Sequence, residues 1–332
     1  MAFSTGASTS IGDLLNRLFT FAAANGWTND NFDVGDKKAS LHKNDVYVHF
    51  QWDEAADGGN LAIYQSLGFI AAGTDVWSHT DDSGSGEPST TGILFDTDRC
   101  VNNLAGPHVA YWFFENDASP AYMHVVVEYD SGLFRHFGFG ELSKIGDWTG
   151  GEYCYGHFWD QTTADIDNPA SGDHGVGLEG AYSGTSYAST LHAEGLPGEP
   201  SALTKWAVFK QQPTSPGNDR AGVERLACLG GWRGGPWAHQ FHGIRISQLN
   251  AFKPLIPMGV LYVDNNPTPD SVYLLGFQQD VALVNIGNIN PKEEFTVGSD
   301  TWVVFPLVRK QYLLTDTEES WNCGIAYKKV TA

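Results

Sequence analysis

The sequence predicts a mainly β protein: a β-sandwich-like core with one short N-terminal helix and long acidic loops. After Trp27 the chain consists of short runs rich in β-branched and aromatic residues, separated by turn-forming Asp, Asn, Gly and Pro. One segment near the start has the 3.6-residue apolar spacing of an amphipathic helix. Hydrophobic residues make up 42% of the 332 residues and aromatic residues 13%, which indicates a folded globular chain.

The predicted helix begins after Thr9 or Ser10, either of which can cap its first turn. Its apolar residues recur at helical spacing and form one face: Leu14, Leu15, Leu18, Phe19 and Ala22. Asn25-Gly26 is the expected end, because glycine readily takes the left-handed conformation that closes a helix.

The predicted strands follow one another along the rest of the chain: Val46–Trp52, Leu61–Phe69, Val109–Phe114, Tyr122–Tyr129, Leu133–Phe139, Trp206–Lys210, Gly259–Val263, Val272–Phe277, Val281–Ile286 and Thr301–Val308. Asp130-Ser131-Gly132 joins two of them and predicts a hairpin. Thr149-Gly150-Gly151 is predicted to be a turn.

Composition divides the chain into three regions. We expect residues 1–160 to form an N-terminal helix plus β domain, residues 161–204 an acidic Gly/Ser-rich loop or insertion, and residues 205–332 a C-terminal β region that could complete the same domain. The net charge is −20, and it is concentrated: residues 44–98 hold 10 acidic residues and residues 145–204 hold 9, with no Lys or Arg in either. We expect both acidic windows to be loops that face solvent.

This charge argues against nucleic acid and anionic membranes as partners, because both bind clustered Lys and Arg. The first residues have neither a basic nor an apolar segment, so we expect no signal peptide. Four dispersed cysteines are expected to be reduced thiols in a protein made in a reducing cytoplasm: Cys100, Cys154, Cys228 and Cys323.

Two patterns suggest metal ions, and each has a simpler interpretation. His239 and His242 could share one helix face, but their Gly/Pro-rich context and the lack of a further ligand nearby favour polar packing. Runs of Asp and Asn such as Asn29–Asp33 could bind Ca²⁺, but none fits the EF-hand pattern and turns are expected instead. We therefore expect no metal and no cofactor.

Carboxylates among aromatic residues raise the alternative of glycoside hydrolysis, which needs two carboxylates about 5–10 Å apart. The candidates are Glu128, Asp130, Glu141, Asp147, Glu152 and Asp160. With 39 acidic residues, some pairs at that distance are expected by chance, so we expect no catalytic residue and no enzyme activity.

The order of several segments along the chain indicates the function more clearly than any of these candidate sites. A helix followed by Gly26-Trp27 leads to a strand ending in Gly68-Phe69, and a later strand has Tyr-Trp-Phe at its centre. Further matching segments are His124–Gly140, Trp148–Tyr153, Val272–Phe277, Thr301–Leu307 and Gly324–Lys329. Over roughly 11–160 and 270–329, this order resembles a family of tailed-bacteriophage virion proteins encoded among tail and baseplate genes.

The resemblance implies a structural subunit of the tail or baseplate in the virion, assembled as a homo-oligomer with other tail and baseplate proteins, and without catalytic residues. Aromatic and Arg side chains usually anchor such contacts. The candidate interface residues lie in the near-neutral C-terminal region: Trp232, Arg233, Trp237 and Phe241. The alternative is a receptor- or glycan-binding virion module, and a third possibility is a glycoside hydrolase.

Overall fold

The computed structural model confirms a mainly β, sandwich-like fold. It describes residues 2–54, 59–71, 100–101, 104–116, 119–156, 158–159, 174–175, 190–194, 206–209, 225–228, 255–264, 271–306 and 323–329. The described elements are one helix, a five-stranded sheet, a 14-stranded sheet and a pair of short strands. That pair is β12 (Phe158–Trp159) and β13 (His174–Gly175).

The five-stranded sheet is antiparallel throughout, in chain order. Its strands are β2 (Thr28–Asp33), β3 (Lys38–Lys43), β4 (Val46–Asp53), β5 (Asn60–Ser66) and β6 (Cys100–Val101).

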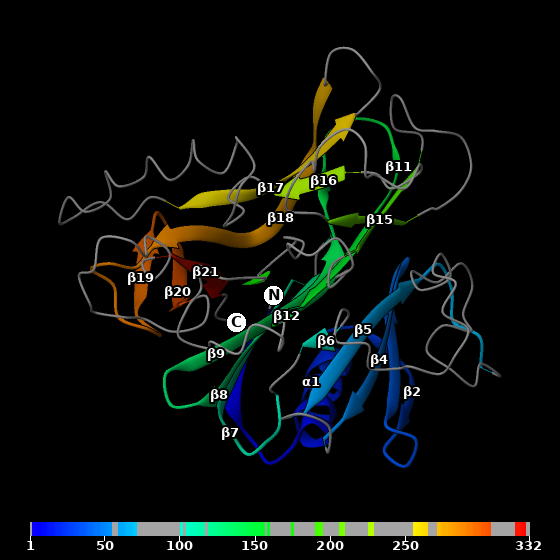
Figure 1. Cartoon of the computed structure of the whole chain (residues 1–332), viewed down its shortest axis with the longest axis vertical. Coiled ribbons are helices and arrows are strands. Elements are labelled where there is room, and N and C mark those ends of the chain that lie inside the picture. The colour runs from blue at the N-terminus through cyan, green and yellow to red at the C-terminus, as the bar shows by residue number, and fades with distance from the viewer. Residues whose placement is uncertain are drawn as a thin grey trace.

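The large sheet begins with β1 (Ala2–Ser8), β7 (His108–Asn116), β8 (Tyr122–Asp130), β9 (Leu133–Glu141) and β11 (Thr149–Gly156). It continues through β14 (Thr190–Glu194), β15 (Trp206–Phe209), β16 (Arg225–Cys228), β17 (Ile256–Asp264) and β18 (Ser271–Asn285). It ends with β21 (Cys323–Lys329), β20 (Asp300–Pro306) and β19 (Glu294–Val297), while β10 (Ser143–Lys144) pairs with β18. Figure 1 shows β7–β9 crossing the middle of the molecule, between β2–β5 on one side and β17–β21 on the other.

Helix α1 (Ile11–Ala24) forms where the sequence predicts it and ends at the predicted Asn25-Gly26, with Asn25 as its C-cap. Ser10 caps it, since its hydroxyl accepts a hydrogen bond from the Asp13 N–H at 3.1 Å. The chain leaves the helix through Gly26, whose φ of +83° favours glycine. The predicted apolar face is buried, and it packs with the five-stranded sheet against one face of β7–β9.

Alternation along β7, β8 and β9 sends successive side chains to opposite faces of the large sheet. The helix-side face is apolar over most of its length and includes Phe113, Val125 and Phe139. Phe139 meets Trp27 and Phe50 edge-on, with ring centroids 5.3 and 5.6 Å apart.

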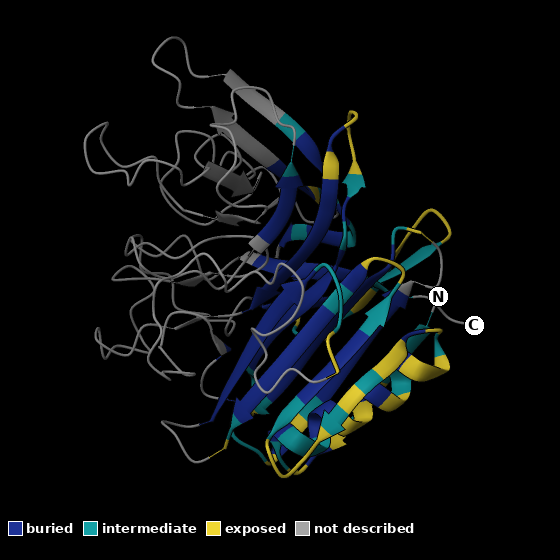
Figure 2. Ribbon diagram, turned by 90° about the vertical axis from the view of Figure 1, so that its right-hand side faces the viewer, coloured by how far each residue is buried: buried dark blue, intermediate teal, exposed yellow. Residues whose placement is uncertain are grey.

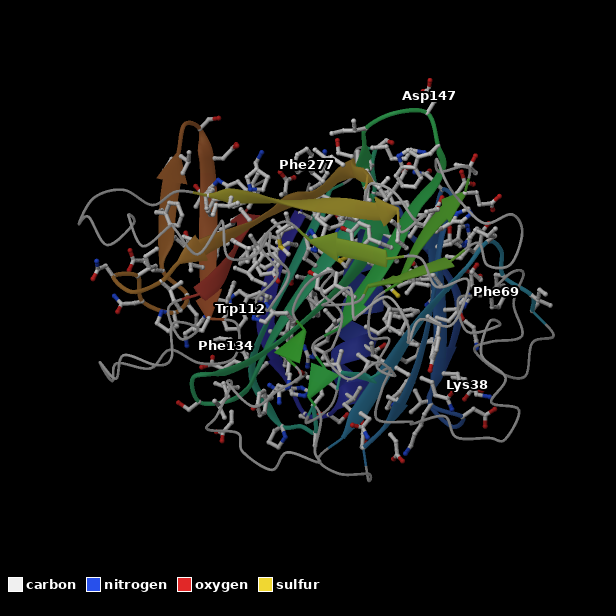
Figure 3. All side chains as sticks on the ribbon, turned by 45° about the horizontal axis from the view of Figure 1, so that its top comes forward. Lys38, Phe69, Trp112, Phe134, Asp147 and Phe277 are labelled. Atoms are coloured by element: carbon white, nitrogen blue, oxygen red, sulfur yellow. The ribbon has the colours of Figure 1, made fainter. Side chains whose placement is uncertain are left out.

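The other face of the same strands is covered by the C-terminal strands of the large sheet. Trp112 and Phe134 lie here, with centroids 6.3 Å apart, and both pack against Phe305 of β20 (Figure 3). The large sheet therefore folds back on itself, and Figure 2 shows the strands in the middle of the molecule buried.

Two buried histidines, one on β8 and one on β9, form hydrogen bonds that hold the C-terminal strands against β7–β9. His124 contacts the Tyr155 hydroxyl through Nδ1 and the Gln279 carbonyl through Nε2, each at 2.9 Å. His136 contacts the Tyr327 hydroxyl and a backbone carbonyl in the same way, again at 2.9 Å. A carbonyl only accepts, so each Nε2 carries the proton and each tyrosine donates to Nδ1. Burial lowers the pKa of His124 to about 4, which keeps the ring neutral.

The Asp130-Ser131-Gly132 hairpin is confirmed, with Asp130 paired to Leu133 across the turn. The predicted strands Val272–Phe277 and Val281–Ile286 are wrong as separate elements, because β18 runs through both. Residues 149–151 are not a turn but the start of β11.

Asn29–Asp33 is neither a turn nor a cation-binding loop but lies within β2. This strand was missed because it is an exposed edge strand without apolar alternation.

The acidic windows are not entirely loops. The window 44–98 contains the whole of the mostly buried strand β4 and of the buried strand β5. The window 145–204 contains β14, in which Leu191 and Ala193 are fully buried.

Candidate functional site

The structure describes five of the six carboxylates that the sequence singled out. Glu128 is bound to Lys292 at 3.1 Å and accepts the Gly132 N–H, so it stabilises the β8–β9 hairpin. Asp130 accepts the Ser131 N–H within that turn. Asp147 lies in the exposed turn between β10 and β11 and points away from the body of the molecule (Figure 3). Asp160 lies outside the described residues.

Glu141 and Glu152 are the two candidates that the fold brings together. They are direct register partners on the antiparallel strands β9 and β11. Directly opposite residues of such a pair share one face of the sheet, with Cβ atoms roughly 4.5–5.5 Å apart. Burial raises the pKa of Glu141, and the nearby charge of Glu152 raises it further, while Lys144 opposes the shift.

His192 of β14 completes this cluster. Its Nδ1 lies 2.7 Å from Glu152 Oε2 and its Nε2 lies 2.9 Å from Glu194 Oε1. Because a carboxylate only accepts, both ring nitrogens donate when the imidazole is protonated. Burial opposes the charge, but the two carboxylates outweigh it and raise the pKa of His192 above its ordinary value. We call Glu141, Glu152, His192 and Glu194 the β9–β14 cluster.

Two adjacent glycines make this contact possible. The pairing of β11 with β14 shifts register between Gly150 and Tyr153. Gly150 has φ +104°, and a Cβ there would lie 2.3 Å from the His192 carbonyl oxygen. The bulge brings the two backbones close and directs Glu152 toward His192. Sequence reasoning noticed the glycines as a turn but missed His192, which no motif surrounds and which lies inside the predicted acidic loop.

In the β9–β14 cluster, His192 can hold a proton between two carboxylates, and its contact with Glu152 links β14 to β11. Glu152 already engages His192 through one oxygen, so this carboxylate is tied into an ion pair. Within the described part of the chain, no group of three or more His, Cys, Asp or Glu is placed to hold a metal ion.

A second feature bearing on function is the contrast among the sheet edges. The edge strand β2 carries Asp30 and Asp33 and has a register shift between Asn29 and Asn31. The edge strand β19 has four residues, and its Glu294 is paired with Lys329 at 2.8 Å. Charges, bulges and short length are the features by which proteins protect a sheet edge from pairing with other chains.

The edge strand β1 lacks this protection over most of its length. Its sequence, AFSTGAS, contains no charge and no proline. Pairing with β7 is regular from Ala2 to Gly6, and the register shifts only between Gly6 and Ser8. Thr5 and Ala7 are exposed, and β1 pairs with no other described strand. Such an edge can accept a strand from another chain.

The remaining sequence candidates fall outside the described residues. These are the predicted interface residues Trp232, Arg233, Trp237 and Phe241, together with the His239/His242 pair. Cys154 is a buried thiol that donates to the Ile63 carbonyl at 3.8 Å, whereas the side chains of the other three cysteines are not described.

No protein-family model and no curated protein sequence matches this chain. Helix α1, the one helix of the described residues, is too short to cross a bilayer.

Proposed function

We propose that this chain is a structural subunit of a tailed-phage virion, in the tail or baseplate, and that it acts by protein–protein assembly in several copies. The observation that carries the proposal is the edge strand β1, which is uncharged and regularly paired over most of its length, whereas the edge strands β2 and β19 carry the protecting features described above. A monomeric protein gains nothing from an edge that invites pairing, whereas an assembling subunit can use it.

Two further features support the proposal. The ordered resemblance to phage tail and baseplate proteins runs over roughly 11–160 and 270–329, which include the strands of both layers of the sandwich. The net charge of −20 makes nucleic acid an unsuitable partner, so contacts with other proteins are the expected basis of assembly.

The direct test is to image virions that carry a tagged copy of the chain. We expect the tag at regularly spaced positions on the tail or baseplate, and we expect loss of particles or of tail assembly when the gene is deleted. Particles that form normally and contain no tagged protein would refute the proposal.

The β9–β14 cluster favours glycoside hydrolysis as a second candidate, because Glu141 has a raised pKa and faces another carboxylate. Purified protein would be incubated with capsular and lipopolysaccharide sugars, beside a Glu141→Gln variant and a Glu128→Gln control. Under the main proposal we expect no turnover from any of the three. Turnover that only the Glu141 variant loses would establish the hydrolase instead.

A further inference from the structure

We propose that β1 pairs with β1 of a second copy of this chain, antiparallel and about a two-fold axis, so that the two large sheets form one continuous sheet. The inference specifies the partner for the assembly proposed above and rests on that proposal only for its place in the virion. It concerns an edge of seven residues whose outward hydrogen-bonding groups meet no other described strand.

Charge does not oppose a second copy at this edge, although it does so elsewhere on the surface. Two molecules that each carry −20 repel one another wherever their acidic surfaces meet. The strand β1 itself is uncharged, and one charged group near each of its ends is already in an ion pair. Lys329, whose Nζ lies 4.8 Å from the Phe3 ring, is paired with Glu294 at one end. Asp13, which accepts the Thr9 N–H, is paired with Arg17 at the other.

Side-chain size also suits self-pairing. Apart from Phe3, the strand contains only Ala, Ser, Thr and Gly, so a second backbone can approach without steric conflict. Gly6 is required within the subunit, because a Cβ there would lie 2.6 Å from Tyr111 Oη. The inner side of β1 is thus occupied by β7, and the outer side is left for another strand.

Symmetry restricts the register to a few possibilities. When a two-fold axis passes through an antiparallel pair, one residue lies opposite its own counterpart. The regular part of β1 runs from Ala2 to Gly6, so full overlap of this part places Ser4 on the axis. Phe3 of each copy then lies opposite Thr5 of the other, and Ala2 lies opposite Gly6.

Cysteine cross-linking tests this register directly. Opposed residues of an antiparallel pair have Cα atoms roughly 4.5–5.5 Å apart, within disulfide range, whereas diagonal neighbours are roughly 7–8 Å apart. Ser4→Cys, a nearly isosteric change, is expected to give a covalent dimer under mild oxidation. Thr5→Cys is expected to cross-link poorly, and Thr28→Cys on the protected edge β2 should match the wild-type background.

A lysine variant tests the association itself. Thr5 and Thr28 are both exposed threonines on edge strands, so Thr5→Lys and Thr28→Lys add the same charge to an unprotected and a protected edge. Thr5→Lys also removes the hydrogen bond that the Thr5 hydroxyl donates to the Tyr111 carbonyl at 2.8 Å, so the folded state of this variant must be checked. We expect light scattering after size exclusion to give a dimer for the wild type and for Thr28→Lys. Thr5→Lys is expected to weaken association at least about tenfold, because it places a charge in the pairing surface. Circular dichroism and thermal unfolding would confirm that both variants fold.

The outcomes separate this inference from the proposed function. A wild type that remains monomeric at high concentration would overturn β1 self-pairing, as would equal effects of the two lysine variants. The wild type could be monomeric in solution while the Thr5→Lys variant is absent from virions. That combination would mean that β1 pairs with a different virion protein. A dimer that cross-links through Ser4→Cys but never enters particles would support the inference and refute the virion role.

Discussion

The two faces of strands β7–β9 are stabilised in different ways. The helix-side face is mostly apolar, with rings such as Phe113 and Phe139 packed against α1 and the five-stranded sheet. The opposite face mixes aromatic rings with a hydrogen-bonded set that includes His124, His136 and Tyr327. Apolar packing responds to volume and is largely indifferent to direction, whereas a buried hydrogen bond requires one alignment. We infer that the first face supplies most of the burial and the second determines how the C-terminal strands dock.

The largest expected effect tests the apolar face. Phe139→Ala removes a fully buried ring that meets both Trp27 and Phe50, and we expect it to lower the free energy of unfolding by ~3–5 kcal/mol. Phe139→Leu, which keeps more of the apolar volume, should be clearly less destabilising. Urea denaturation would measure both. Equal losses would mean that ring geometry, rather than volume, governs this face.

The next effect uses pH to test the hydrogen-bonded face. The pKa of His124 is about 4 in the folded chain and roughly 6.5 when unfolded, so the unfolded state binds more protons between these values. Stability should therefore decrease by ~3 kcal/mol as the pH falls from about 6.5 to 4. In the His124→Gln variant, stability should depend less steeply on pH over this range. Part of the pH dependence should remain, because burial also lowers the pKa of His108. Chemical denaturation at several pH values would measure it.

His192 provides the control of opposite sign. Its folded pKa is raised, so its contribution is fully present below the unfolded value of roughly 6.5 and is lost as the pH rises through the folded value. His192→Gln should therefore lose stability mainly below a pH of roughly 6.5, and it should remove the decrease in stability that His192 causes as the pH rises above that value. A loss of stability in this variant that is larger above this pH than below it would contradict the assignment of the two histidines.

The smallest effect compares two neighbouring tyrosines of β11. Tyr155 donates to His124, whereas the Tyr153 hydroxyl has no hydrogen-bond partner among the described residues although it lies near Gln278. Tyr155→Phe leaves a buried acceptor unpaired and should cost ~1–2 kcal/mol. Tyr153→Phe removes only an unpaired polar atom and should be neutral or slightly stabilising. Thermal unfolding of both variants would reveal the difference, and equal losses would show that the hydroxyl of Tyr155 has no special role.

Much of the local structure could be predicted from the sequence because it depends on neighbouring residues. Helix α1 follows from a capping Ser10, an apolar stripe and Gly26, all within one segment. The β8–β9 hairpin likewise follows from two strand-forming runs and the turn between them. The edge strand β2 could not be predicted in this way, because polar exposed residues form a strand there only through pairing with β3.

The candidate site depended on tertiary structure to a greater degree. Glu141 and Glu152 were recognisable as carboxylates among aromatic residues, but 39 acidic residues gave no means of choosing this pair. Their opposition arises from the register of β9 with β11, and His192 joins them through a bulge at Gly150. The same holds for β1, whose uncharged composition is visible in the sequence but whose position at a sheet edge is not. Composition and periodicity determine which segments become helix or strand, because those preferences act over a few residues. Contacts between residues far apart in the chain decide which strands are neighbours, which acids face one another and which edge strand has no second partner.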